Sequence, residues 1–212
     1  MTGPSLGPAH APAEVRILAL GDSYTIGEGV AEADRWPVRL AAMLRARGLN
    51  TATPRIIART GWTTDELSAA IDAARPDSNY DLVTLLIGVN NQYRGRIEEE
   101  YRTQFRTLLD GAIAFARGQA ARVIVVSIPD WGVTAFAMGR DRPAIARAID
   151  RFNDVNREET SRAGAHYADI TPLSRRAAGD ASLVAADGLH PSAKMYAAWL
   201  DVIHPIALRI LS

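Results

Sequence analysis

The chain has 212 residues, of which 48% are hydrophobic and 23% are charged, so it is long enough for one globular domain with a sizeable core. Its 24 acidic and 24 basic side chains balance, and no basic stripe stands out, which argues against a nucleic-acid-binding protein. The sequence contains no cysteine, which excludes disulfides, thiolate nucleophiles and cysteine-bound zinc.

The first 14 residues are rich in proline, glycine and alanine and lack a basic segment followed by a continuous apolar stretch. They are therefore predicted to form a flexible tail, not a signal peptide, ahead of one domain over residues 15–212. No apolar run approaches the roughly 18 residues that a membrane span requires. We expect no membrane span and a cytoplasmic location, whereas the sequence leaves the oligomeric state open.

Short apolar runs alternate with longer amphipathic segments along the chain, which is typical of a parallel sheet with helices on both faces. Thr63 and Glu66 have the spacing of a capping box, Ser192 is placed to cap the last helix, and Pro205 predicts a kink in it. In chain order the pattern predicts a strand over 15–20, a helix over 36–47, a strand over 55–58, a helix over 63–74, a strand over 82–87, a helix over 97–117, a strand over 122–128, a helix over 143–163, a strand over 165–170 and a helix over 192–211.

Ligands bind outside the carboxyl ends of the strands in such sheets, so residues that directly follow strands are the first candidates for a site. Ser23 follows the first predicted strand and is well placed to be an exposed nucleophile, although capping a helix would explain it equally well. Gly61 follows the second strand, where a glycine lets the backbone approach a ligand closely or serves an ordinary turn.

Two further segments carry side chains that suit acyl transfer. Asn90 follows the third strand, and its uncharged amide can stabilise an oxyanion without supplying a proton. Asp187 and His190 precede the last helix at a spacing that lets the carboxylate meet the imidazole if the segment turns. A serine, a histidine with its carboxylate, and oxyanion donors together make a complete acyl-transfer site.

These segments resemble the four sequence blocks of the SGNH hydrolases, also called the GDSL family. Asn91 stands where the family usually has aspartate, and Tyr24 stands where it commonly has leucine or another apolar residue. The change at Asn91 is expected to alter local hydrogen bonds and to leave the chemistry intact. The matching blocks are GDSYT at 21–25, a single glycine at 61, GVNN at 88–91 and DGLHP at 187–191.

The resemblance implies an α/β fold, a flavodoxin-like three-layer α/β/α sandwich with a five-stranded parallel sheet. It also implies hydrolysis of carboxylic esters or thioesters, with a small-molecule ester as the only expected partner and with no metal or cofactor. Ser23 would be the nucleophile, His190 the base and Asp187 its orienting acid. The backbone N–H groups of Ser23 and Gly61 and the side chain of Asn90 would form the oxyanion hole.

Four aromatic residues flank the proposed site in sequence and are candidates for substrate binding, although packing would explain each of them: Tyr24, Trp62, Tyr93 and Trp131. The segment 127–132 is expected to form one wall of the site. Arg94 and Arg96 could meet an anionic substrate, but we interpret them as residues of a solvated loop.

Two other functions stay open. An acyltransferase or deacetylase would use the same triad and differ only in the acyl acceptor or the acyl group. A nucleotide-binding module would account for Gly21, Gly27 and Gly29, but the glycine patterns of dinucleotide and P-loop sites are both absent, and Glu28 would lie where phosphate binds. The elbow motif of the α/β-hydrolases is absent because Thr25 replaces its final glycine.

Overall fold

The computed structural model describes residues 14–212, so the predicted tail lies outside the described residues except for Glu14. Five parallel strands form one sheet in the order β2-β1-β3-β4-β5. This is the flavodoxin-like arrangement that the family resemblance implies, and it places the reversal of strand order between β1 and β3. The strands are β1 (Ile17–Asp22), β2 (Arg55–Arg59), β3 (Leu82–Leu86), β4 (Val123–Val126) and β5 (His166–Ala168).

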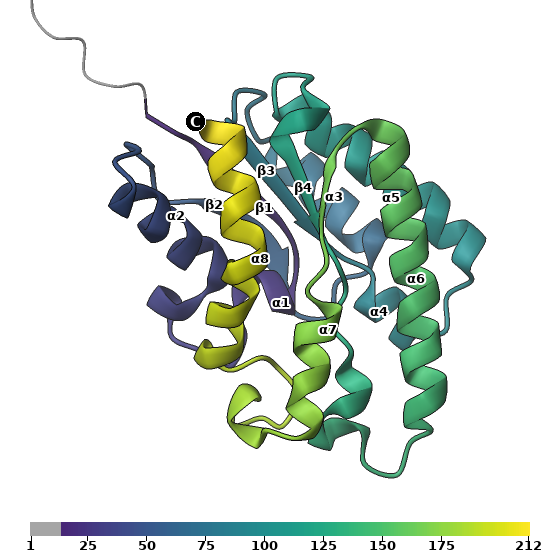
Figure 1. Cartoon of the computed structure of the whole chain (residues 1–212). Helices are drawn as coiled ribbons and strands as arrows, with labels where there is room; N and C mark the ends of the chain where they lie inside the picture. The colour runs from purple at the N-terminus through teal and green to yellow at the C-terminus, as the bar shows by residue number, and fades with distance from the viewer. Residues whose placement is uncertain (1–13) are drawn as a thin grey trace, which may run out of the picture.

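Helices cover both faces of the sheet and complete a three-layer sandwich (Figure 1). On one face α2 (Trp36–Ala46) packs against α8 (Ala193–Leu211). On the other face α5 (Glu98–Phe115) packs between α3 (Thr64–Ala74) and α6 (Arg142–Ala163). Three short helices, α1 (Ser23–Ile26), α4 (Val89–Tyr93) and α7 (Thr171–Ser174), lie together at one end of the sheet in Figure 1.

The central strands are apolar because helices bury them on both sides. Every residue of β1 and β3 is buried, as the continuous apolar run of β3 predicts. Burying one leucine, isoleucine or valine side chain stabilises a fold by about 1.5–3 kcal/mol, so these two strands form a rigid base for the loops that follow them.

The predicted helix caps are confirmed. Thr63 precedes α3, and its backbone N–H donates to the Glu66 carboxylate at 2.8 Å in a capping box. The Ser192 hydroxyl accepts a hydrogen bond from the backbone N–H of Met195 at the start of α8. Helix α8 continues through Pro205 to Leu211.

The carboxyl ends of three strands, β1, β4 and β5, lie two residues from their predicted positions. Strand β1 continues to Asp22, two residues beyond the predicted end at residue 20, and Gly21 lies inside it. A Cβ atom at Gly21 would lie 2.4 Å from the carbonyl oxygen of Leu86, so the glycine permits the close approach of β1 and β3. Strand β4 stops at Val126, and the Ser127 hydroxyl beyond it accepts hydrogen bonds from backbone N–H groups of residues 170 and 171.

Candidate active site

Ser23 is the first residue of α1 and directly follows β1, at the reversal of strand order. Its side chain is largely buried, with 5% of the residue exposed. Asp22 caps the helix, and its carboxylate accepts a hydrogen bond from the backbone N–H of Tyr24 at 3.0 Å. The cap fixes the turn that carries Ser23.

Asp187 and His190 meet in the tight turn before α8, as their spacing predicts. The Asp187 Oδ2 atom lies 2.7 Å from His190 Nδ1, while Oδ1 accepts hydrogen bonds of 2.9 Å from the backbone N–H groups of Leu189 and His190. Burial alone would raise the pKa of Asp187, but these donors outweigh it and lower that pKa. Asp187 is therefore ionised at neutral pH, His190 Nδ1 carries the proton, and His190 Nε2 remains for a second partner.

The turn with Asp187 and His190 is held in place by the loop after α1. Gly29 has a positive φ of 82°, and a Cβ atom there would lie 2.8 Å from the Ala185 side chain and 3.4 Å from Asp187 Oδ2. The absence of a side chain at Gly29 thus lets the two loops pack closely. Sequence reasoning weighed this glycine only as part of a nucleotide-binding loop.

Ser23, His190 and Asn90 line one pocket of about 150 Å³, which we call the Ser23 pocket. Residues from four separate segments of the chain meet there, and His190 is the only ionisable side chain among them apart from two tyrosines. The remaining lining residues are Tyr24, Val89, Tyr93, Trp131, Phe136 and Leu189. Three of the four aromatic residues singled out in the sequence line this pocket, and Trp62 is outside the lining.

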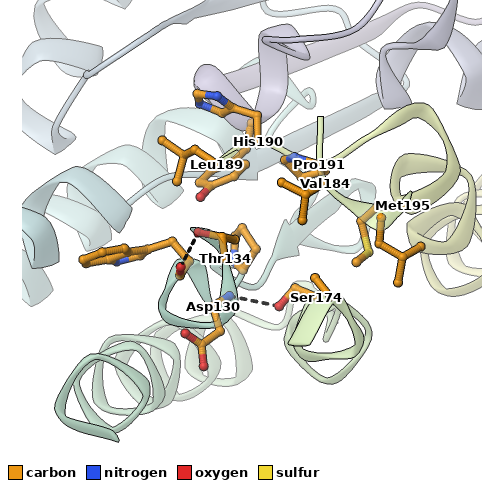
Figure 2. Close-up of a pocket in the computed structure, with 13 residues that line it drawn as sticks. Asp130, Thr134, Ser174, Val184, Leu189, His190, Pro191 and Met195 are labelled. Atoms are coloured by element: carbon orange, nitrogen blue, oxygen red, sulfur yellow. Dashed lines mark hydrogen bonds between the residues drawn. The ribbon is translucent and has the colours of Figure 1, made fainter. Parts of the chain in front are cut away.

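A second, inner pocket lies behind His190 and shares Tyr24, Trp131 and Leu189 with the Ser23 pocket. In Figure 2, His190 and Leu189 lie on one side of it and Asp130 and Ser174 on the other. Its volume is about 20 Å³, the space of roughly one water molecule, so it is too small for an acyl group.

Asp130 lines the inner pocket but is fully engaged in the scaffold. Its Oδ1 atom accepts from the backbone N–H of Gly132, and its Oδ2 atom accepts from Arg175 Nε, both at 2.9 Å. The two oxygens of Asp130 thus bind Gly132 and Arg175, whereas an oxygen of Asp187 is paired with His190.

Asn90 belongs to α4, which follows β3 at the same end of the sheet as Ser23. One N–H of its side chain donates to the backbone carbonyl of Trp62 at 2.9 Å, and the amide has a second N–H. This bond joins α4 to the loop that carries Gly61, whose φ is 84°. Gly61 itself is outside the lining of the Ser23 pocket.

Asn91, which replaces the usual aspartate, is 2% exposed and binds the start of α3. Its Oδ1 atom accepts from the backbone N–H of Thr64, and its Nδ2 donates to the Thr64 hydroxyl at 2.7 Å. That hydroxyl donates its single proton to Gln104, so it can bind residue 91 only as an acceptor. An amide provides a donor and an ionised carboxylate does not, which explains asparagine here.

One wall of the Ser23 pocket is a cluster of three aromatic rings, Tyr93, Trp131 and Phe136. Their ring centroids are 5.4–6.1 Å apart, within the range of favourable aromatic pairs. The guanidinium of Arg140 lies 5.2–5.5 Å from the three ring centroids and donates to the Tyr93 hydroxyl. Trp131 confirms the wall expected over 127–132, whereas sequence reasoning missed Phe136 and Arg140.

Asp22 is buried, and its carboxyl group is a weaker acid than usual. The residue is fully buried, and its Oδ2 atom has no hydrogen-bond partner. Burial raises the pKa of Asp22 from the usual 3.8 to about 7, although the N–H of Tyr24 opposes this shift. A largely neutral acid therefore lies next to Ser23 at mildly acidic pH.

Residues 14–212 contain no group of three or more His, Asp or Glu side chains arranged to hold a metal ion. Over the same residues, no helix has both the length and the apolar character needed to cross a lipid bilayer.

Solved structures of similar fold cover nearly the whole chain. A crystal structure of TesA matches with a TM-score of 0.71 and 20% identity, over 92% of this chain and 99% of that one. The psychrotrophic esterase EstA from Pseudoalteromonas sp. matches with a TM-score of 0.67 and 19% identity, over 92% and 98%. Axe2, an acetylxylan esterase from Geobacillus stearothermophilus, matches with a TM-score of 0.65 and 17% identity, over 93% and 94%. At these identities the similarity shows a shared fold.

The sandwich fold and the four matching sequence blocks define a class of proteins, the SGNH hydrolases. Residues 19–198 match the model of the GDSL-like Lipase/Acylhydrolase family, and the chain belongs to this family. No curated protein matches the chain in sequence.

Proposed function

We propose that the chain is a serine ester hydrolase that cleaves small carboxylic esters through an acyl-enzyme. The observation that carries this proposal is the meeting of Ser23, His190 and Asn90 in one pocket, with Asp187 hydrogen-bonded to the far side of His190. Family membership and the esterases among the similar structures support it.

In the proposed reaction, His190 Nε2 takes the hydroxyl proton while Ser23 Oγ attacks the ester carbonyl. The ionised Asp187 holds the proton of His190 Nδ1 and stabilises the imidazolium. His190 then protonates the leaving alcohol as the carbon–oxygen bond breaks. Water attacks the acyl-enzyme with His190 again as base, which releases the acid and restores Ser23.

The negative oxygen of the tetrahedral intermediate needs donors that are already in place. We assign this role to the backbone N–H groups of Ser23 and Gly61 and to the second N–H of Asn90. The first N–H of Asn90 is held by Trp62, so the direction of the second is fixed as well. Removal of one such donor typically lowers the rate by about 10²–10³.

The Ser23 pocket limits the size and charge of the acyl group. An apolar cavity of about 150 Å³ holds a benzene molecule, so the pocket fits acyl groups of up to about six carbons. No side chain that is charged at neutral pH, other than His190 when protonated, lines it. We therefore propose short uncharged acyl groups, acetyl included, and assign Tyr24, Tyr93 and Trp131 to substrate contact, while Trp62 acts through its carbonyl.

The glycines that would suit a nucleotide-binding loop have other roles in the fold. Gly21 allows the approach of β1 to β3, and Gly29 allows the approach of its loop to Asp187. Gly27 ends α1 in the left-handed conformation. These contacts favour the hydrolase over the nucleotide-binding module. A cytoplasmic location and one domain over residues 15–212 stay predictions.

The test is hydrolysis of p-nitrophenyl esters from acetate to decanoate by the wild type and by Ser23→Ala. We expect turnover that needs Ser23 and falls for acyl chains longer than about six carbons. Ser161→Ala, which changes an exposed serine on α6, is the matched control and should behave as wild type. Adding methanol at low concentration reports the acyl acceptor through the ratio of free acid to methyl ester, because a hydrolase gives mostly the acid and a transferase mostly the ester. Equal activity of Ser23→Ala and wild type would refute the proposal.

A further inference from the structure

Arg94 contacts the backbone of the loop that carries Gly61, although the sequence suggested a solvated residue. Its Nη2 atom donates to the carbonyl oxygen of Gly61 at 2.6 Å. Arg94 also ends α4, where its backbone N–H donates to the carbonyl of Asn90 at 3.0 Å. One residue thus connects Gly61 and Asn90, two of the three proposed oxyanion donors.

Helix α4 holds two successive peptide groups of this loop. Arg94 binds the carbonyl of Gly61, and Asn90 binds the carbonyl of Trp62, the next residue. With both carbonyls fixed, the 61–62 and 62–63 peptide groups cannot rotate freely, and the Gly61 N–H belongs to the peptide group directly before them. The loop therefore has a defined position relative to α4 and to the Ser23 pocket.

Gly61 requires such a constraint because packing does not provide it. Its φ of 84° lies in a region that glycine visits readily, together with many others. Among the described residues, Arg94 Nη2 is the one heavy atom outside the neighbouring residues that lies within 4 Å of a Cβ position at Gly61, at 3.8 Å. Hydrogen bonds, not side-chain contacts, therefore select the conformation of this glycine.

The guanidinium is itself held from a second helix. Both oxygens of Glu66 lie 3.3 Å from nitrogen atoms of Arg94. Glu66 is the capping-box residue of α3, and its hydrogen bond from the backbone N–H of Thr63 is the largest cause of its lowered pKa. Glu66 stays ionised at neutral pH and keeps Arg94 directed at Gly61.

We infer that Arg94 is a positioning residue of the oxyanion hole, acting through the Gly61 peptide without touching the substrate. This inference rests on the proposed function. A donor that is misplaced by about 1 Å can cost up to 10²-fold in rate, and the loss falls on the transition state. Losing Arg94 should therefore lower kcat and leave KM nearly unchanged.

The test compares Arg94→Ala and Arg94→Lys with Arg96→Ala on p-nitrophenyl butyrate. Arg96 is the matched control, an exposed arginine that pairs with Glu100 outside the Ser23 pocket. We expect kcat of Arg94→Ala to fall about tenfold to hundredfold with a similar KM, Arg94→Lys to fall less, and Arg96→Ala to keep wild-type values. Added guanidinium ion at low concentration should restore part of the kcat of Arg94→Ala.

Two further measurements separate positioning from folding. Affinity for butylboronic acid, which forms a tetrahedral adduct on a serine, should fall in Arg94→Ala by about the same factor as kcat/KM. Glu66→Gln keeps an acceptor for Thr63 and loses the charge, so it should give a smaller loss in the same direction. Wild-type kcat in Arg94→Ala, or a loss confined to KM, overturns the inference alone. No ester turnover by the wild type overturns the proposed function and this inference together.

Discussion

One part of the Ser23 pocket, the first side, is fixed by hydrogen bonds, and another part, the second side, is the cluster of three aromatic rings, two of which are exposed to solvent. On the first side, Asn90, Arg94 and Asp187 bind backbone groups of the loops that carry the proposed chemistry. On the second side, Tyr93 and Phe136 are 45% and 43% exposed, and their rings contact one another, Trp131 and the guanidinium of Arg140.

The two kinds of construction suit different tasks. Directional hydrogen bonds fix donors and bases to within fractions of an ångström, which transition-state stabilisation requires. Ring contacts are less directional and adapt more readily to the group they cover. We therefore expect substitutions on the first side to change kcat and substitutions on the second to change which ester is preferred.

The largest effects should come from Asp187 and His190 on the hydrogen-bonded side. His190→Ala removes the base and should lower kcat by a factor of about 10⁶. Asp187→Asn keeps the base but removes the carboxylate charge that orients it, and should lower kcat by a factor of about 10⁴. Steady-state rates on p-nitrophenyl butyrate measure both. Asp72→Asn, on the exposed face of α3, is the control. If His190→Ala and Asp187→Asn both keep more than a tenth of the wild-type kcat, the assigned roles are wrong.

A smaller loss should follow when the loop contact at Gly29 is broken. An alanine there must displace the turn that carries Asp187, and a misplacement of about 1 Å costs up to 10²-fold in rate. Gly48→Ala is the control because Gly48 has a similar φ of 85° and open space around it. Both variants should lose stability in urea unfolding because of the positive φ, Gly29→Ala the more because of its contact with Ala185, and only Gly29→Ala should lose kcat. Equal kcat in the two variants would argue against the loop contact.

The aromatic side should respond in specificity. Phe136→Ala opens the pocket, so kcat/KM for p-nitrophenyl octanoate relative to butyrate should rise about tenfold. Met138→Ala removes another exposed apolar side chain, 78% exposed and outside the pocket lining, and should keep the wild-type ratio. If Phe136→Ala instead lowers kcat equally for all esters, Phe136 supports catalysis and does not set the ester preference.

The smallest expected effect on the site is that of Asp22, the buried residue before Ser23, and it is a change in stability. Its pKa is raised from 3.8 to about 7, so the stability that its neutral form contributes is present below pH 3.8 and is lost as pH rises through about 7. Asp22→Asn keeps an acceptor for the N–H of Tyr24 and cannot ionise. Urea unfolding should show Asp22→Asn gaining stability relative to wild type from pH 5 to pH 8. If the difference in unfolding free energy between Asp22→Asn and wild type is the same at pH 5 and pH 8, the pKa of Asp22 is not raised in the folded protein.

The sequence was informative where local pattern decides the structure. The apolar run at 82–87 predicted a buried strand, and Thr63 with Glu66 predicted the start of α3. The triad spacing of Asp187 and His190 predicted their contact because both lie in one turn.

Features that depend on distant segments were not predictable. Arg94 binds the backbone carbonyl of Gly61, 33 positions away. Because every residue has such a carbonyl, the sequence does not show which one a side chain binds. Phe136 lies in a stretch without helical or strand periodicity, and its place at the pocket follows from how that stretch packs on Trp131. Gly29 was considered only within the nucleotide-binding alternative, whereas in the structure it packs against Ala185.

The central claim is that Ser23 is the nucleophile, and covalent labelling tests it most directly. The protein would be treated with a fluorophosphonate, and its intact mass and modified peptide would be determined by mass spectrometry. The account predicts one adduct per chain, located on Ser23, absent in Ser23→Ala and formed far more slowly in His190→Ala. An adduct on another residue, or ester turnover with Ser23 unmodified and dispensable, would contradict it.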